Sequence, residues 1–166
     1  MTQGYDTFLA AAANDRRDTF IATARRLGAA EQNIEKDFWV CWTLDALFNR
    51  LPAGGPRLLF KGGTSLSKAF GLIARFSEDI DVTVFRDDLG EGASVAELEA
   101  MSGRRRKEKL EAIRDACQTY IAGPLLTQLA GLLTTSLAQA SIATDSARIE
   151  VDAADDGRQT LLLWYP

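Results

Sequence analysis

The chain has 166 residues, of which 46% are hydrophobic and 25% charged, and its 19 basic and 23 acidic side chains give a formal net charge of −4. These values are typical of one globular domain with its own core, and they argue against disordered, fibrous and disulfide-stapled proteins. The sequence has no histidine and two cysteines, which excludes Ser-His-Asp and Cys-His catalysis as well as HExxH and cysteine-rich zinc sites.

The location of the protein is predicted from what the sequence lacks. The first six residues contain no basic segment followed by an apolar stretch, so we expect no signal peptide. No run approaches about 18 uninterrupted apolar residues, so we expect no membrane-spanning segment. Cys41 and Cys117 lie in apolar helical patterns and are expected to be reduced core residues. Together these features predict a cytoplasmic protein without a membrane partner.

Hydrophobic spacing and turn residues predict the elements of the first half of the chain: helices at 6–27 and 31–50, a strand at 58–60, a helix at 66–73 and a strand at 80–85. The same signals predict the second half: helices at 95–101, 104–122 and 124–140, then hairpin strands at 148–152 and 160–165. Gly28 is expected to end the first helix, and Pro124 is expected in the first turn of the last one. Asp156-Gly157 is a signal for the hairpin turn.

This order of elements predicts a single domain over residues 1–166, with N-terminal helices at 6–50 and a core at 57–166. The expected fold is α+β (mixed α/β), with helices covering a small mixed sheet. The chain stops directly after an apolar strand, at residues 164–166. We therefore expect either a natural edge strand or a fragment of a longer protein.

The first candidate site is the glycine turn that follows the strand at 58–60. Gly62 and Gly63 allow a close backbone approach to a ligand, and a helix start offers free N–H groups and a positive dipole end. Thr64 and Ser65 add hydroxyl donors, and Lys61 adds positive charge, all of which suit a phosphate. The alternative interpretation is a tight strand-to-helix turn in which Thr64 caps the helix.

The second candidate site is an acidic pair at the start of the next strand. Asp79 and Asp81 are two residues apart on that strand and so project from one face, while Ile80 and Val82 point to the core. Two adjacent carboxylates repel each other, and Mg²⁺ or Mn²⁺ would offset that repulsion. The alternative is a solvated strand face. One short helix separates the two strands, so we expect them to be neighbours, and a phosphate site beside a metal site suits phosphoryl or nucleotidyl transfer.

These motifs resemble a known family. Residues 60–68 (FKGGTSLSK) and 75–82 (RFSEDIDV) resemble the signature of the AbiEii/AbiGii-type nucleotidyltransferase toxins, within the polymerase-beta-like nucleotidyltransferase superfamily. Residues 35–40 (EKDFWV) and 161–166 (LLLWYP) resemble the same family, so the resemblance covers about residues 30–166. Taken without the family resemblance, the charges at 35–37 suggest an exposed helix edge. With the resemblance, Lys36 or Asp37 is expected to orient the sheet or to approach the site.

The resemblance implies a polymerase-beta-like sheet and a set of site residues: phosphate contacts from Lys61, Gly62, Gly63, Thr64, Ser65 and Arg75, and a Mg²⁺ (or Mn²⁺) ion on Asp79 and Asp81. A third carboxylate normally comes from a later strand of the family. Glu150 and Asp152, which share a strand face, are the candidates within the chain, and the alternative is a polar hairpin face. The remaining family motifs normally follow the last strand, so we expect this chain to lack C-terminal family elements.

The implied function is that of a toxin of an abortive-infection or type IV toxin–antitoxin system. Such an enzyme would transfer a nucleotide from an NTP to an acceptor such as RNA or a tRNA end, and its partner would be a cognate antitoxin. Two alternatives remain open, namely a non-catalytic nucleotide-binding remnant and an aminoglycoside-like small-molecule nucleotidyltransferase. The basic run at 104–109 would either grip an RNA backbone or form a solvated helix face balanced by Glu108 and Glu111.

Overall fold

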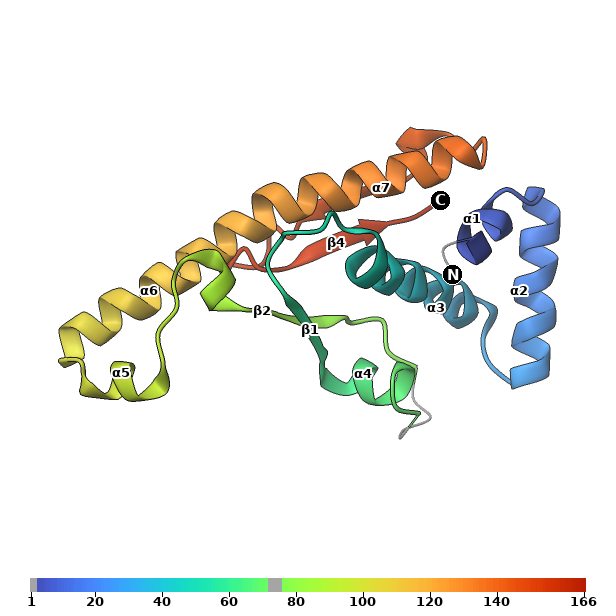
Figure 1. Cartoon of the computed structure of the whole chain (residues 1–166). Coiled ribbons are helices and arrows are strands. Elements are labelled where there is room, and N and C mark those ends of the chain that lie inside the picture. The colour runs from blue at the N-terminus through green and yellow to red at the C-terminus, as the bar shows by residue number, and fades with distance from the viewer. Residues whose placement is uncertain (1–2, 72–75) are drawn as a thin grey trace.

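The computed structural model describes residues 3–71 and 76–166 of the chain, and it shows a mostly helical α+β fold (Figure 1). The α-helices are α1 (Gln3–Leu9), α2 (Ala13–Leu27), α3 (Glu31–Asp45), α4 (Gly62–Lys68), α5 (Val95–Ala100), α6 (Gly103–Tyr120) and α7 (Leu126–Gln139). The strands are β1 (Leu58–Lys61), β2 (Asp81–Val84), β3 (Arg148–Val151) and β4 (Leu161–Trp164). Short π-helical turns follow α3 (η1, Ala46–Arg50) and α6 (η3, Ile121–Leu125), and 3₁₀ turns are η2 (Arg86–Leu89) and η4 (Thr144–Ser146).

The first predicted helix is divided into α1 and α2. The guanidinium of Arg16 donates to the carbonyl oxygens of Leu9 and Ala11, both at 2.8 Å, and so satisfies backbone groups that the break leaves open. Gly28 ends α2 with φ 64, in the left-handed region, as the sequence predicted.

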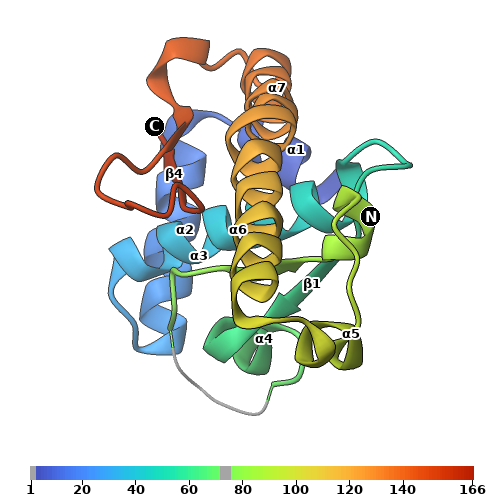
Figure 2. The same cartoon turned by 90° about the vertical axis from the view of Figure 1, so that its left-hand side faces the viewer.

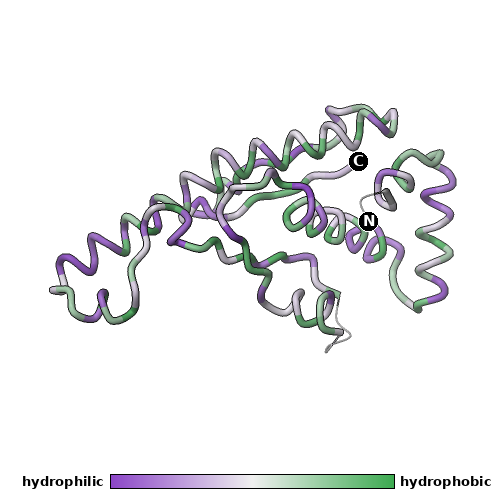
Figure 3. Tube along the Cα trace, viewed as in Figure 1, coloured by the Kyte–Doolittle hydropathy of each residue, from purple (hydrophilic) through white to green (hydrophobic). Residues whose placement is uncertain are grey.

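The two last predicted helices form one continuous helix, Gly103–Gln139, of 37 residues. The prediction that Pro124 starts a new helix is therefore wrong, because Pro124 lies inside the helix, in the π turn η3. A proline has no N–H to donate and its ring crowds the preceding turn, and a π turn widens the helix at that point. By length and hydropathy alone this helix could cross a membrane, but the core helix of a globular protein passes the same test. Its α6 end is largely hydrophilic (Figure 3).

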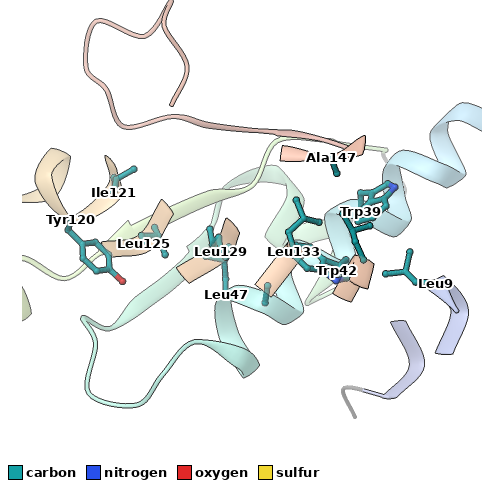
Figure 4. Packing of buried hydrophobic residues seen from close by; sticks show 12 residues of the cluster. Leu9, Trp39, Trp42, Leu47, Tyr120, Ile121, Leu125, Leu129, Leu133 and Ala147 are labelled. Carbon is teal, nitrogen blue, oxygen red and sulfur yellow. The ribbon is translucent and has the colours of Figure 1, made fainter. Parts of the chain in front are cut away.

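The hydrophobic core lies between α7, α3 and α1 (Figure 4). Its buried members come mainly from these helices and the π turns: Leu9, Trp39, Trp42, Ala46, Leu47, Tyr120, Ile121, Leu125, Leu129, Leu133, Leu137 and Ala147. Ile80, Val82 and Val84 pack against this cluster, which confirms the inward face predicted for the second strand. Cys41 and Cys117 are free, half-buried thiols, and burial raises the pKa of both.

The strands form two separate antiparallel pairs in the described residues. β1 pairs with β2, with Leu58 opposite Val84, so the predicted adjacency of the two motif-bearing strands is confirmed. β3 pairs with β4 and packs on α7, whereas the β1–β2 pair contacts α4. In Figures 1 and 2, β4 runs beside α7 and α4 lies at the opposite edge of the molecule. The prediction of one small mixed sheet is therefore wrong for this structure, because the described strands hydrogen-bond only within each pair, although both pairs pack against the core cluster.

Candidate functional site

The glycine turn and the acidic segment meet at the end of the β1–β2 pair. β1 ends at Lys61, α4 begins at Gly62, and Lys61 lies opposite Asp81 in the antiparallel register. The turn is possible because Gly62 adopts φ 74, in the left-handed region where residues with a side chain are strained. The strand end, the helix start and the first residue of β2 thus converge at one point.

The carboxylate of Asp81 lies directly against the backbone of Gly62. A Cβ atom added to Gly62 would lie 2.0 Å from Asp81 Oδ2, 2.9 Å from its Cγ and 3.1 Å from its Cβ. No side chain fits there while Asp81 keeps this position. At Gly63, by contrast, an added Cβ would meet nothing within 4 Å, so the turn is open on that side.

Asp79 reaches the site by a different route from the one the sequence predicted. β2 begins at Asp81, so Asp79 precedes the strand and does not share its pleat. β1 has already turned into α4 at this level, and the Asp79 carbonyl oxygen accepts a hydrogen bond from the Thr64 hydroxyl instead of a strand partner. The prediction that Asp79 lies on the strand is wrong, although its backbone is still tied to the glycine turn.

Both carboxylates are exposed to solvent. Within residues 3–71 and 76–166, no donor or cation pairs with Asp79 or Asp81. Two exposed carboxylates match the preference of Mg²⁺ for one or two carboxylate ligands together with substrate phosphates, so the donor set fits that ion. The same ranges contain no group of three or more Asp, Glu or Cys side chains that could hold a metal ion.

The hydroxyl groups of the turn point into the protein. Thr64, 1% exposed, places its hydroxyl 2.7 Å from Ser77 Oγ as well as on the Asp79 carbonyl. Ser65 is also buried and donates to the carbonyl oxygen of Gly62 at 2.8 Å. The alternative in which Thr64 caps the helix is wrong, because the helix already begins at Gly62. The two hydroxyls hold the shape of the turn, and its backbone faces outward.

Comparison with known proteins identifies the family. The sequence model of AbiEii, described as a nucleotidyl transferase AbiEii toxin of a type IV toxin–antitoxin system, matches residues 45–163. This chain belongs to the AbiEii family. Neither the curated proteins nor the solved structures that were compared gave a match.

Membership of the AbiEii family confirms the resemblance found in the sequence and makes this protein a nucleotidyltransferase by family, with a nucleotide substrate and an antitoxin partner implied. The matched range includes the turn at 61–65 and both Asp79 and Asp81. Lys36 and Asp37 precede it.

The other predicted phosphate contacts of the AbiEii chain are Lys61 and Arg75. Lys61 is exposed at the end of β1, next to the turn. Arg75 lies outside the described residues, and its role stays a prediction.

The two candidates for a third AbiEii carboxylate belong to the other strand pair. Glu150 accepts hydrogen bonds from the Arg148 guanidinium at 3.1 Å and from Trp164 Nε1 at 2.8 Å, and these contacts lower its pKa. Asp152 follows β3 and accepts a hydrogen bond from the Ala154 amide at 2.8 Å. Neither forms a metal-binding group with Asp79 and Asp81 in the described part of the chain.

Two residues of α3 contact the segments that carry the site of this AbiEii protein. Lys36 forms an ion pair with Glu78, next to Asp79, and Asp37 forms an ion pair with Lys68, at the end of α4. Hydrophobic spacing alone did not identify these contacts, because it placed the charges on an exposed helix edge. The resemblance of the EKDFWV segment to the family is what predicted that Lys36 or Asp37 approaches the site, whereas the Phe38, Trp39 and Val40 of the same segment pack in or against the core.

Most of the basic run on α6 is paired within the protein. Arg104 pairs with Glu108 at 2.9 Å, and Lys107 with Glu111 at 3.9 Å, as the solvated-face interpretation predicted. The Arg106 guanidinium donates to carbonyl oxygens at the end of α5. These contacts stabilise the α5–α6 region of the protein. Binding of RNA by the basic residues at 104–109 stays a prediction.

Proposed function

We propose that this AbiEii protein transfers a nucleotide from an NTP to an acceptor hydroxyl, with Mg²⁺ or Mn²⁺ held by Asp79 and Asp81. The family supplies the class of reaction. The observation that carries the assignment of residues is the contact of the Asp81 carboxylate with Gly62, which places an exposed acid beside a backbone turn suited to phosphate.

In this proposal the nucleotide phosphates lie along the turn. Lys61 and Arg75 supply positive charge, and the backbone N–H groups at 62–65 supply donors, since the first amides of a helix have no partner within it. Thr64 and Ser65 act through their backbone, because their hydroxyls already bond inside the protein. The metal ion, when bound, would neutralise phosphate charge and bring the nucleotide to the carboxylates.

The proposed reaction replaces the phosphoanhydride bond between the α- and β-phosphates of the NTP with a phosphodiester bond to the acceptor. The acceptor hydroxyl gives up its proton to a carboxylate or to solvent, its oxygen forms a bond to the α-phosphorus, the bond from that phosphorus to the leaving oxygen breaks, and pyrophosphate departs. The protein's part is to align the α-phosphate between the turn and the acid pair, which lowers the entropic cost of reaching the reactive geometry. The exposure of Asp79 and Asp81 leaves that position open to an acceptor as large as RNA.

We further propose that the acceptor is RNA, such as a tRNA end, that the protein acts in the cytoplasm, and that a cognate antitoxin opposes it. These steps rest on the family description of a type IV toxin. The second candidate is a nucleotide-binding protein without catalysis. It is favoured by one observation, namely that the described residues form no group of three acids that could hold a metal ion.

The test is transfer of label from each α-labelled NTP, with Mg²⁺, to total tRNA or to an aminoglycoside. We compare the wild type with Asp79→Asn, Asp81→Asn and the control Asp115→Asn, which removes an exposed carboxylate of α6. We expect labelled RNA with the wild type and the control only. Equal labelling by all four proteins would show that Asp79 and Asp81 are not needed for the reaction. Label on the aminoglycoside instead of the tRNA would show that the acceptor is a small molecule. Nucleotide binding without transfer would support the second candidate.

A further inference from the structure

Two neighbouring residues of α3 hold the two segments that make up the candidate site. The ammonium group of Lys36 pairs with the carboxylate of Glu78, in the segment that carries Asp79. The carboxylate of Asp37 pairs with the ammonium group of Lys68, in the last turn of α4. We propose that Lys36 and Asp37 are positioning residues, which hold the acidic segment and the glycine turn at the separation that the site requires.

The contacts form a closed triangle of elements. α3 is tied to residues 76–80 through Lys36 and to α4 through Asp37, and the third side is the bond from the Thr64 hydroxyl to the Asp79 carbonyl. Adjacent residues on a helix project about 100° apart, which lets one turn of α3 reach two different elements. A shift of either element relative to the other therefore has to break at least one side of the triangle.

α3, which carries both ion-pairing residues, is held in the core. Trp39 and Trp42 follow the pair on α3 and are buried, at 5% and 0% exposure, so the helix is fixed in the core. The packing of Tyr165 on Trp39, with ring centroids 5.5 Å apart, adds the C-terminal segment to the same helix. Lys36 and Asp37 thus connect a helix that is fixed in the core to the two segments of the site.

The ion pairs themselves are partly exposed. The side chains of Lys36 and Glu78 are 30% and 54% exposed, and those of Lys68 and Asp37 are 23% and 34% exposed. Pairs of this kind contribute little to global stability. Their expected effect is local, on the position of the glycine turn relative to Asp81, whose carboxylate lies against Gly62.

This inference rests on the proposed function, but its test has a readout that needs no activity. We measure backbone hydrogen exchange by mass spectrometry over 62–68 and 76–81, together with thermal midpoints and kcat and KM for the NTP. The variants are Lys36→Glu, Asp37→Lys, and the charge swaps Lys36→Glu with Glu78→Lys and Asp37→Lys with Lys68→Asp. The matched control swap is Arg114→Asp with Asp115→Arg, an exposed ion pair of α6.

Each single reversal should speed exchange in the two site segments by about three- to tenfold, and each swap should restore it to within about twofold of wild type. The thermal midpoint should stay constant, kcat should fall and recover in parallel with exchange, and the control swap should change none of these values. Unchanged exchange in the single variants, or a loss of thermal midpoint that accounts for the loss of kcat, would overturn the positioning role. If exchange responds as expected and the wild type transfers no label, the proposed function fails and the positioning role stands.

Discussion

Gly62 is the residue on which the geometry of the candidate site depends most. It combines a left-handed backbone, φ 74, with direct contact to the Asp81 carboxylate. Either feature alone would favour glycine, and together they exclude a larger residue unless the Asp81 side chain moves. Glycine at position 62 is therefore needed for the contact with Asp81 as well as for the backbone conformation of the turn.

The first prediction concerns the variant Gly62→Ala. The new methyl group must displace the Asp81 side chain and adopts an unfavourable φ, so we expect transfer to fall at least about 100-fold and the free energy of unfolding to fall by about 1–2 kcal/mol. Label transfer and urea unfolding measure the two effects. The control is Gly131→Ala in α7, where a Cβ meets nothing within 4 Å and helix propensity predicts a gain of about 0.5–1 kcal/mol. Full activity in Gly62→Ala would contradict the contact.

The sequence was sufficient to select Gly62 and Asp81 but not to place Asp79. The first two follow from local rules, a glycine after a strand and an acid at the start of the next one. Asp79 is held by Thr64, 15 residues earlier, through a hydroxyl that the sequence assigned to a phosphate. A hydrogen bond between segments has no periodic signature, so the predicted strand began one residue early, at 80, and Asp79 was assigned to its face.

At the scale of elements, the β3–β4 hairpin is organised by Asp155 and not by the predicted turn pair alone. Its carboxylate accepts hydrogen bonds from the backbone amides of Gly157, Gln159 and Thr160 and from the Thr160 hydroxyl. These donors favour the ionised form and lower the pKa of Asp155 below its ordinary value. The ionised carboxylate therefore stabilises the loop.

The second prediction is a pH dependence that this carboxylate imposes. Because its pKa is lower in the folded state, its contribution to stability is complete above the ordinary pKa of about 3.8 and is lost as the pH falls through the folded value. In urea unfolding, Asp155→Asn should be less stable than the wild type at about pH 6, and the difference should shrink below about pH 4. A difference that stays constant with pH would contradict the role of the ionised carboxylate.

Element types were more predictable from the sequence than their ends and pairings. The helix at 31–50 and the two motif-bearing strands follow from hydrophobic spacing. Pro124 was misplaced because a π turn accommodates proline inside a helix, and the local sequence gives no sign of this. The pairing of four strands into two separate sheets depends on which helix covers each pair, and that is decided by tertiary packing.

At the scale of the whole molecule, a buried polar network joins the N-terminal helix to the core. Arg50, at the end of η1, donates to Asp45 at 2.6 Å, to Asp6 of α1 at 3.2 Å and to the Ser136 hydroxyl of α7 at 3.3 Å. The side chains of Arg50 and Asp45 are only 10% and 8% exposed. The network fixes α1 against α7.

The third prediction is that Arg50→Met destabilises the protein strongly. The substitution leaves the Asp45 carboxylate buried with Asn49 as its remaining described donor, and the expected loss is about 3–5 kcal/mol of unfolding free energy. The matched control is Arg57→Met, whose partner Asp88 is paired at 2.7 Å but whose own side chain is 64% exposed, so the expected loss is much smaller. Equal losses in urea unfolding would contradict the importance of burial.

The account rests on one metal–nucleotide being shared by the acid pair and the glycine turn. Mn²⁺ electron paramagnetic resonance, titrated with a non-hydrolysable NTP analogue, tests this most directly. We expect that the wild type binds Mn²⁺ tightly only when the nucleotide is present, and that Asp79→Asn, Asp81→Asn and Gly62→Ala each lose this binding. Nucleotide-dependent Mn²⁺ binding of equal strength in the wild type and all three variants would contradict it.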